Sequence, residues 1–417
     1  MRKYQAVIIG GGSAGLSAAV TLKENGIEDI VVIEKDSEPG GILEQCIHNG
    51  FGLQTFHEQL SGPAYAERYV NMAKKLNVPF KLNTMVTALH PDRTIEYVNA
   101  EEGYVTVQAD AIILAVGCYE RPRGGVNIMG TRPAGIYTAG QAQRYLNIDG
   151  YLVGKKVFIL GSGDIGLIMA RRMTLEGAKV YGVAEIMPYS NGLPRNMKQC
   201  LEDFNIPLYL SHTVTRVYGR DRLEKIELSQ VDDHRQPIPG TQQYFDVDTL
   251  LLSVGLIPEN HLAEKAGIRM DPRIKGPVVD DTYMTSVPGI FACGNGLHVH
   301  DLVDYVSLQA KRAALGAVRY LKQQAPTGTE YQTEPGDGIG YVVPARVHCD
   351  INDNVEFFFR VRKPMETGTL EVRCGDQVLR HMQKHKLMPS EMERMVITGK
   401  ELAGLDGNLV FSVKEDQ

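Results

Sequence analysis

The sequence predicts an α/β fold for most of the chain, followed by a small β-rich region at the C-terminal end. Two observations predict the first part: a strand–glycine turn–helix–strand pattern opens the chain and then recurs near its middle. A third, the run of short strand patterns after Leu321, predicts the second part. A chain of 417 residues is too long for one ordinary core, so two or three domains are expected.

The first unit begins with the apolar run Ala6–Ile9, which is typical of a buried parallel strand. Glycines 10, 12 and 15 then form a G-x-G-x-x-G turn into an alanine-rich helix, and the next strand ends at Glu34. In such a turn Gly10 permits the tight bend, Gly12 lets the backbone approach a pyrophosphate, and Gly15 lets helix and strand pack closely. The helix N-terminus faces the phosphates and Glu34 can accept a ribose hydroxyl, which predicts a Rossmann-like dinucleotide-binding unit.

The second unit repeats the pattern in KKVFILGSGDIGLIMARRMTLEGAKVYGVAE, with glycines at 161, 163 and 166 and an acidic residue at Glu185. Two dinucleotide units in one chain predict a flavin that takes hydride from a nicotinamide. The stretch IMPYSNG after Glu185 has no basic residue for a 2′-phosphate, which favours NAD over NADP. Arg171 and Arg172 on the intervening helix leave NADP open.

Three later segments fit the same plan. DAIILAVG (110–117) and DTLLLSVGLIPEN (248–260) are apolar strands that close on a glycine, and residues 289–321 form a strand, a loop and a long helix. From about residue 4 to 325 the chain thus resembles the two-dinucleotide-binding flavoprotein superfamily, the pyridine nucleotide–disulfide oxidoreductase fold. In that superfamily an acidic residue of the late loop holds the flavin's ribityl chain; Asn295 stands there in this chain.

The resemblance implies two Rossmann-like domains, one inserted in the other. An FAD-binding domain is expected at residues 1–121 and 276–324, and an NAD-binding domain with its connector at 122–275. QQAPTGTEYQTEPGDG (323–338) is expected to be a linker, and 335–417 a β-sandwich-like domain that serves as a docking surface.

The expected cofactor-binding residues comprise both glycine turns, both acidic residues, and positions on or beside the strands that close each site. They are Gly10, Gly12, Ser13, Ala14, Gly15, Glu34, Lys35, Gly41, Val86, Ala115, Gly117, Gly294 and Asn295 for FAD, and Gly161, Gly163, Asp164, Ile165, Gly166, Glu185 and Gly255 for NAD.

Composition excludes several other classes of protein. A formal net charge of −6 argues against broad nucleic-acid binding, and no apolar stretch is long enough for a membrane span. The opening residues run straight into a strand, so no leader is predicted. The six cysteines are scattered without a C-x-x-C, which suits a reducing cytoplasm and predicts no metal site.

Cys46 lies where disulfide reductases of the superfamily carry a redox pair, G-G-x-C-x-x-x-x-C. Aligned on Gly40-Gly41, the two cysteine positions hold Leu43 and His48. Since a dithiol relay needs a second thiolate to resolve the mixed disulfide, the sequence predicts that the chain is not a disulfide reductase.

The stretches GGILEQCIHNGFGLQTF, GCYERPRG, TRPAGIYTAGQAQR and CGNGLHVHDLVDYVS resemble a narrower family. Its members are NAD/FAD-dependent oxidoreductases associated with glycerol-3-phosphate dehydrogenase, related to the flavin subunits of opine oxidase and hydrogen cyanide synthase. The resemblance implies partner subunits in an electron-transfer complex, among them a small cysteine-bearing protein and a dehydrogenase subunit. A homo-oligomer is also open.

Candidate catalytic residues are Cys46, His48, His298 and His300. A histidine titrates near neutral pH and could move the proton that accompanies hydride. The alternatives are structural hydrogen bonding for the histidines, a metal site in H-V-H-D-x-x-D, and simple packing for Cys46.

Three functions follow from these features. The first is an FAD enzyme that exchanges hydride with NAD(H) and passes electrons to a partner subunit, as in a glycerol-3-phosphate dehydrogenase-type complex. The second is the flavin subunit of an amine, opine or 2-hydroxy-acid dehydrogenase. The third is a non-enzymic redox-sensing module.

Overall fold

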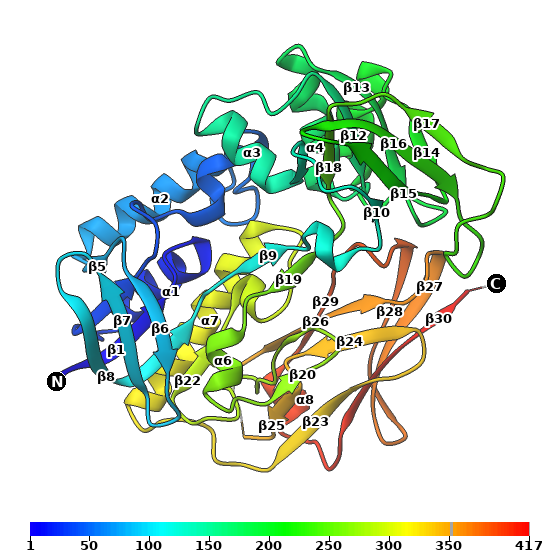
Figure 1. Cartoon of the computed structure of the whole chain (residues 1–417). Coiled ribbons are helices and arrows are strands. Elements are labelled where there is room, and N and C mark those ends of the chain that lie inside the picture. The colour runs from blue at the N-terminus through cyan, green and yellow to red at the C-terminus, as the bar shows by residue number, and fades with distance from the viewer. Residues whose placement is uncertain (351–352, 417) are drawn as a thin grey trace. The chain divides into compact units, whose positions relative to one another are not determined.

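The computed structural model describes residues 1–350 and 353–416 and divides the chain into two compact units (Figure 1). Unit 1 comprises Met1–Cys118 and Pro258–Gln417, and unit 2 comprises Tyr119–Ile257. The second unit is therefore inserted in the sequence of the first. Each contains a Rossmann-like parallel sheet, and unit 1 also contains the C-terminal β-rich part, which confirms the predicted fold class.

The central sheet of unit 1 has the strand order β5-β2-β1-β8-β7-β6, and β22 also pairs with β8. The apolar strands β1, β2, β5, β8 and β22 run parallel, whereas β6 and β7 are antiparallel additions. The bounds are β1 (Arg2–Ile9), β2 (Ile30–Ile33), β5 (Phe80–Lys81), β6 (Met85–Leu89), β7 (Thr94–Asn99), β8 (Gly103–Leu114) and β22 (Ile290–Ala292).

Helices α1 (Ser13–Glu24) and α7 (Val303–Leu321) pack against each other beside this sheet, and α2 (Gly62–Lys75) packs on α1. Small side chains make the close approach of α1 and α7 feasible, since Ala18 and Ala314 are completely buried. The smaller elements are η1 (Gly41–Gln45), β3 (Asn49–Phe51), β4 (Leu60–Ser61), α6 (His261–Lys265), β20 (Met270–Asp271), β21 (Gly276–Pro277) and η4 (Gly294–Gly296). None of the helices in the described part of the chain is both long and apolar enough to cross a membrane.

Unit 2, green in Figure 1, has a wholly parallel sheet in the order β11-β18-β12-β13-β14. A second sheet follows the order β10-β15-β16-β17. The bounds are β9 (Cys118–Glu120), η2 (Arg123–Gly125), β10 (Met129–Gly130), β11 (Ile136–Thr138), α3 (Ala139–Asn147), β12 (Lys156–Leu160), α4 (Asp164–Leu175), β13 (Lys179–Glu185), α5 (Pro194–Cys200), η3 (Glu202–Phe204), β14 (Leu208–Leu210), β15 (His212–Gly219), β16 (Leu223–Gln230), β17 (Gln243–Phe245), β18 (Thr249–Leu252) and β19 (Leu256–Pro258).

The C-terminal strands form two further sheets, β25-β23-β30-β27-β28 and β24-β26-β29, around their own apolar cluster. The bounds are β23 (Glu330–Pro335), β24 (Ile339–Val343), β25 (Arg346–His348), β26 (Val355–Val361), β27 (Met365–Cys374), β28 (Gln377–Leu387), β29 (Glu393–Ile397), α8 (Gly399–Leu402) and β30 (Leu409–Glu415).

Two features of this C-terminal part differ from the sequence prediction. The expected linker 323–338 contains β23, which pairs with β30 and β25 although its side chains are mostly polar. Strand β28 was not predicted either, because it lies at a sheet edge and its exposed polar side chains show no apolar alternation.

The second boundary between the units also differs from the prediction. It lies at Pro258, not at Gly276. Ala263, Ala266 and Ile268 are buried in the same apolar cluster as β1 and β8, and the Asn260 side chain donates to the carbonyl oxygen of Gly296 at 2.8 Å. These contacts hold residues 258–275 in unit 1.

Candidate functional site: two matched dinucleotide turns

The first glycine turn joins the end of β1 to α1. Each of its three positions is occupied by glycine for a different structural reason. Gly10 has φ +103°, and a Cβ there would lie 2.3 Å from the Ala115 oxygen. A Cβ at Gly15 would lie 1.8 Å from the Gly10 oxygen. At Gly12, the N-cap of α1, the nearest atom to a Cβ would be 3.9 Å away. The fold itself therefore requires glycine at positions 10 and 15, whereas Gly12 leaves room for a group outside the protein.

Glu34, the acidic residue that closes the unit, is buried and fixed by backbone donors. Its Oε2 accepts from the Gly11 amide at 2.6 Å and its Oε1 from the Asp36 amide at 2.8 Å. Each carboxylate oxygen retains a second lone pair, so Glu34 can still accept a ribose hydroxyl.

The other residues expected at FAD surround this turn. Ser13 and Ala14 begin α1, and Gly41 lies against Gly12. Ala115 and Gly117 follow the end of β8, while Val86 is buried in β6. Lys35 is exposed and forms an ion pair with Asp36 at 2.9 Å.

The loop Cys293–Leu302 closes the same edge of the sheet. A Cβ at Gly294 would lie 3.0 Å from the Cβ of Ala14, so the loop touches the start of α1. The Asn295 side chain accepts from the His300 amide at 3.0 Å and donates to the Cys118 sulfur at 3.7 Å. Asn295 thus organises the loop internally, a role that an acidic side chain could share only in part because it cannot donate.

His298 and His300 are buried side by side with ring centroids 4.3 Å apart, and Gln309 of α7 sets their tautomers. Because the Gly294 amide donates to Gln309 Oε1 at 2.8 Å, the amide nitrogen of Gln309 must face His298 Nε2, at 2.8 Å. His298 Nε2 is then an acceptor and its proton is on Nδ1. His300 Nε2, 3.1 Å from Gln309 Oε1, is a donor.

Both rings are neutral near physiological pH. Burial, together with His300 and Arg360, lowers the pKa of His298 well below its usual range. Burial lowers the pKa of His300 to about 4, although its hydrogen bond with Gln309 acts in the opposite direction. Their surroundings are Phe358 and Tyr341 of the C-terminal strands, which favours the structural interpretation of both histidines over proton transfer.

Cys46 and His48 lie on the segment after η1. The Cys46 thiol donates to the Ile42 oxygen at 3.2 Å, and burial raises its pKa to about 12. His48 Nδ1 lies 3.3 Å from the Asn49 oxygen, and its ring packs on Phe51. The thiol is therefore protonated at neutral pH and a weak nucleophile.

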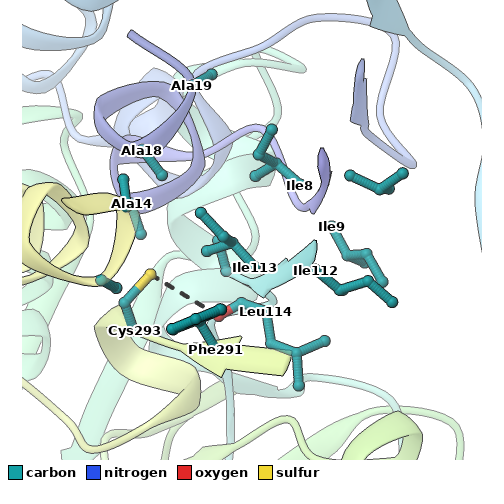
Figure 2. Close-up of a cluster of buried hydrophobic side chains, with 14 of the residues drawn as sticks. Ile8, Ile9, Ala14, Ala18, Ala19, Ile112, Ile113, Leu114, Phe291 and Cys293 are labelled. Carbon is teal, nitrogen blue, oxygen red and sulfur yellow. Dashed lines mark hydrogen bonds between the residues drawn. The ribbon is translucent and has the colours of Figure 1, made fainter. Parts of the chain in front are cut away.

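Cys293 is a packing residue. Figure 2 shows its sulfur among Ala14, Ile113 and Phe291, directed at the Leu114 oxygen 3.8 Å away. Burial raises the pKa of this thiol to about 12, so Cys293 is not suited to resolve a mixed disulfide on Cys46.

The second glycine turn, between β12 and α4, repeats the first. Gly161 has φ +100°, with a Cβ there 2.0 Å from the Ser253 oxygen, and a Cβ at Gly166 would lie 2.6 Å from the Gly161 oxygen. At Gly163 the nearest atom, Ser253 Oγ, would be 3.5 Å away, which is an ordinary contact. Again the middle glycine is the one that the fold does not require.

The two carboxylate oxygens of Glu185 accept hydrogen bonds from backbone amides in the same pattern as those of Glu34. Its Oε2 accepts from the Ser162 amide at 3.0 Å and its Oε1 from the Met187 amide at 3.0 Å. In both units the turn amide precedes the glutamate by 23 residues, and the second donor follows it by two. The hydroxyl of Ser162 adds a further bond to Glu185 at 2.7 Å.

The remaining residues expected at NAD lie around this turn. Asp164 begins α4 and accepts from the Leu193 amide at 2.9 Å and the Asn196 side chain at 2.7 Å, which ties the segment before α5 to the turn. Ile165 follows it in the first turn of α4, partly buried. Gly255 lies just after β18 with φ +100° and open space around it.

Sequence reasoning missed the buried Gln309 on α7, whereas Asp304 of the same helix was considered as the last residue of the possible metal motif H-V-H-D-x-x-D. Gln309 sets the histidine tautomers, and Asp304 accepts from the Gly52 and Thr55 amides at 3.1 and 2.8 Å, which anchors the loop after Cys46. A signal was present for Gln309, since it is a polar residue on the small-residue face of the helix.

Among the described residues, Asp280, Asp281 and His348 place potential metal-ligand atoms within 4.8 Å of one another. The carboxylate oxygens of Asp280 and Asp281 already accept hydrogen bonds from protein donors. His348 Nδ1 lies 2.7 Å from Asp281 Oδ1, and Asp280 Oδ1 accepts from the Thr282 and Met284 amides at 2.8 and 3.0 Å. We therefore interpret the cluster as an ion pair and a turn that join β25 to the loop before β22.

Comparison with known proteins agrees with this architecture. A family model described as "Pyridine nucleotide-disulphide oxidoreductase" matches residues 4–312. An opine oxidase subunit of Agrobacterium tumefaciens is 25% identical over 338 residues, covering 76% of this chain and 66% of the relative. The hydrogen cyanide synthase subunit HcnB of Pseudomonas protegens is 25% identical over 334 residues, covering 74% of this chain and 67% of the relative.

Among solved structures, thioredoxin reductase of T. acidophilum superposes with a TM-score of 0.63 at 23% identity, covering 76% of this chain and 98% of that one. This likeness concerns the fold alone. The C-terminal strands lie beyond the residues that the family model matches.

Proposed function

The chain belongs to the pyridine nucleotide-disulphide oxidoreductase family and is a flavin-dependent oxidoreductase, and on that premise we propose that it binds FAD in unit 1, exchanges hydride with NAD(H) bound in unit 2, and passes electrons to a partner subunit. The repeated turn geometry carries this proposal. Each unit has a middle glycine that the fold does not require, together with a buried glutamate held by the same two backbone donors.

The chain's own residues bind and orient the two dinucleotides. Gly12 and Gly163 leave space for a pyrophosphate at the N-termini of α1 and α4, and Glu34 and Glu185 accept ribose hydroxyls. When bound, the flavin supplies the redox chemistry, since it accepts a hydride from a reduced nicotinamide and releases electrons to an acceptor. Neither Cys46 nor Cys293 has a part in this proposal, because burial raises the pKa of the Cys46 thiol to about 12 and Cys293 is enclosed by apolar side chains.

We further propose NAD as the nicotinamide cofactor. The two arginines that left NADP open have other partners: Arg172 pairs with Glu176 at 2.5 Å and with Asn147 at 2.9 Å, and Arg171 stacks over the Phe204 ring. A carboxylate at Glu185 would repel a 2′-phosphate.

The proposal of a partner rests on the relatives, which are named as subunits of opine oxidase and hydrogen cyanide synthase. The resemblance to oxidoreductases associated with glycerol-3-phosphate dehydrogenase suggests that the partners are a small cysteine-bearing protein and a dehydrogenase subunit.

Anaerobic mixing of the FAD-loaded protein with NADH tests the proposal. Bleaching of the flavin absorbance within seconds is expected, followed by recovery of the absorbance when an artificial acceptor is added. A flavin that stays oxidised with excess NADH would contradict it.

The second candidate function is a flavin subunit that oxidises an amine, opine or 2-hydroxy acid directly. The similarity to the opine oxidase chain of Agrobacterium tumefaciens favours it. In that case such a substrate, and not NADH, would bleach the flavin in the same experiment.

A further inference from the structure

The loop Cys293–Leu302 reaches from the phosphate-binding turn to the C-terminal sheet. At one end, Gly294 lies against Ala14 at the start of α1. A Cβ at Gly296 would lie 3.0 Å from a Val116 methyl group and 3.4 Å from the Gly117 amide, so the loop also covers the end of β8. This end therefore lies where the carboxyl ends of parallel strands bind a dinucleotide.

The other end of the loop is held by Arg360 of β26. One terminal nitrogen of Arg360, Nη2, donates to the Val299 oxygen at 3.2 Å and to Asp301 Oδ1 at 2.5 Å. The second oxygen of Asp301 accepts from the Met392 amide at 2.6 Å. The loop that carries His298 and His300 is thus held by the ion pair between Arg360 and Asp301. Two hydrogen bonds that involve backbone atoms, at Val299 and Met392, hold it as well.

Arg360 is itself rigidly placed, because its other donors are also engaged. Its Nε donates to the Tyr341 hydroxyl at 3.2 Å, and its Nη1 donates to the Ser390 and Pro389 oxygens. Phe358, two residues earlier on the same face of β26, packs on the rings of His298 and His300 with centroids 5.7 and 5.6 Å away. The planar guanidinium therefore links the loop to β24, β26 and the segment before β29.

We propose that Arg360 is a positioning residue for the flavin, which it serves by holding the loop Cys293–Leu302 against the turn at Gly12–Ala14. The inference rests on the proposed function, since it takes unit 1 as the FAD site. It also gives the C-terminal strands a role within that site, in addition to any docking role. Its effect passes through Val299 and Asp301 along the loop to Gly294 and Asn295.

The test compares Arg360→Met and Arg360→Lys with the control Arg312→Met. Arg312 pairs with Glu356, also on β26, at 2.8 Å, and Glu356 keeps Arg394 at 2.6 Å when Arg312 is lost. The control therefore breaks an ion pair between β26 and α7 and leaves the bonds of Arg360 to the loop in place.

Amide hydrogen exchange of the FAD-free proteins measures directly how firmly the loop is held. Peptides covering residues 294–302 should exchange faster in Arg360→Met, less so in Arg360→Lys, and at the wild-type rate in Arg312→Met. If Arg360→Met does not fold, Arg360→Lys alone decides this comparison, because a lysine can reach Asp301 but cannot reproduce the planar set of bonds.

FAD titration of the same proteins measures the effect of the loop on FAD affinity. Arg360→Met should raise the Kd for FAD roughly tenfold or more and shift the midpoint potential of the bound flavin, since a charge-assisted contact that fixes the loop is lost. Arg312→Met should leave the Kd for FAD within about threefold of wild type, because the bonds between Arg360 and the loop stay in place. Unchanged exchange in Arg360→Lys, or wild-type FAD affinity in folded Arg360→Met, would overturn the inference. Wild-type protein that binds no FAD would overturn the proposed function itself, whatever the exchange rates.

Discussion

Replacement of Gly12 by alanine should remove FAD binding and leave the fold intact. A Cβ at Gly12 would come no closer than 3.9 Å to Gly41 Cα and 4.0 Å to the Gly40 oxygen, both ordinary contacts. Gly12 also has φ −76°, which alanine adopts without strain. The FAD-free variant should therefore fold and melt like FAD-free wild type.

The loss should appear only when FAD is present. A methyl group at the N-terminus of α1 occupies the space through which the backbone approaches the pyrophosphate. Wild type with free FAD at about a hundred times its Kd gains about 2.7 kcal/mol of stability, whereas a variant that cannot bind gains none. Differential scanning fluorimetry with and without FAD measures this difference, and the flavin absorbance of the purified proteins gives an independent reading.

Two matched variants complete the experiment. Gly15→Ala places a Cβ 1.8 Å from the Gly10 oxygen and should unfold or misfold the protein, with or without FAD. Gly163→Ala has the same open geometry as Gly12→Ala and should keep FAD while losing NADH binding. An FAD-dependent rise in melting temperature as large in Gly12→Ala as in wild type would refute the assignment of this turn.

Three more predictions follow from the site. Glu185 should give NADH a roughly ten- to hundredfold advantage in kcat/KM over NADPH, and Glu185→Ala should reduce it; a preference for NADPH in wild type would contradict this. Cys46→Ser should leave flavin reduction by NADH within severalfold of wild type, and neither protein should turn over glutathione disulfide, thioredoxin or lipoamide; disulfide turnover that vanishes in the serine variant would show a hidden thiol relay. Burial opposes the charge on His348, but its hydrogen bond with Asp281 and the negative charges of Asp281, Asp280 and Glu330 together outweigh burial, so the pKa of His348 is raised. The resulting stability is complete below the ordinary histidine pKa of about 6.5 and is lost as the pH rises through the raised value, so urea unfolding of His348→Gln should show a smaller decline over that range; an unchanged decline would show that the pair contributes nothing.

Local patterns in the sequence were sufficient to predict the positions of the two dinucleotide units. Gly10, Gly15 and Glu34 stand at fixed spacings because a strand, a tight turn and a helix must meet within a few residues. The same holds for the second unit, and so both turns could be located without coordinates. The sequence also predicted the C-terminal strands whose apolar side chains alternate, such as β30.

Contacts between distant segments could not be predicted in the same way. Whether Gly12 or Gly15 tolerates a side chain depends on atoms that the fold brings to each position, and the tautomers of His298 and His300 depend on Gln309 of the following helix. The sequence therefore left proton transfer and structural bonding open for these histidines.

What the sequence determined by itself is the pair of dinucleotide units, because each is encoded by residues close together in the chain. Tertiary structure alone decided that burial raises the pKa values of the Cys46 and Cys293 thiols and that Arg360, far along the chain, holds the loop beside the first turn. The physical reason is that burial, charge pairing and the reach of a side chain depend on neighbours that only the folded chain supplies.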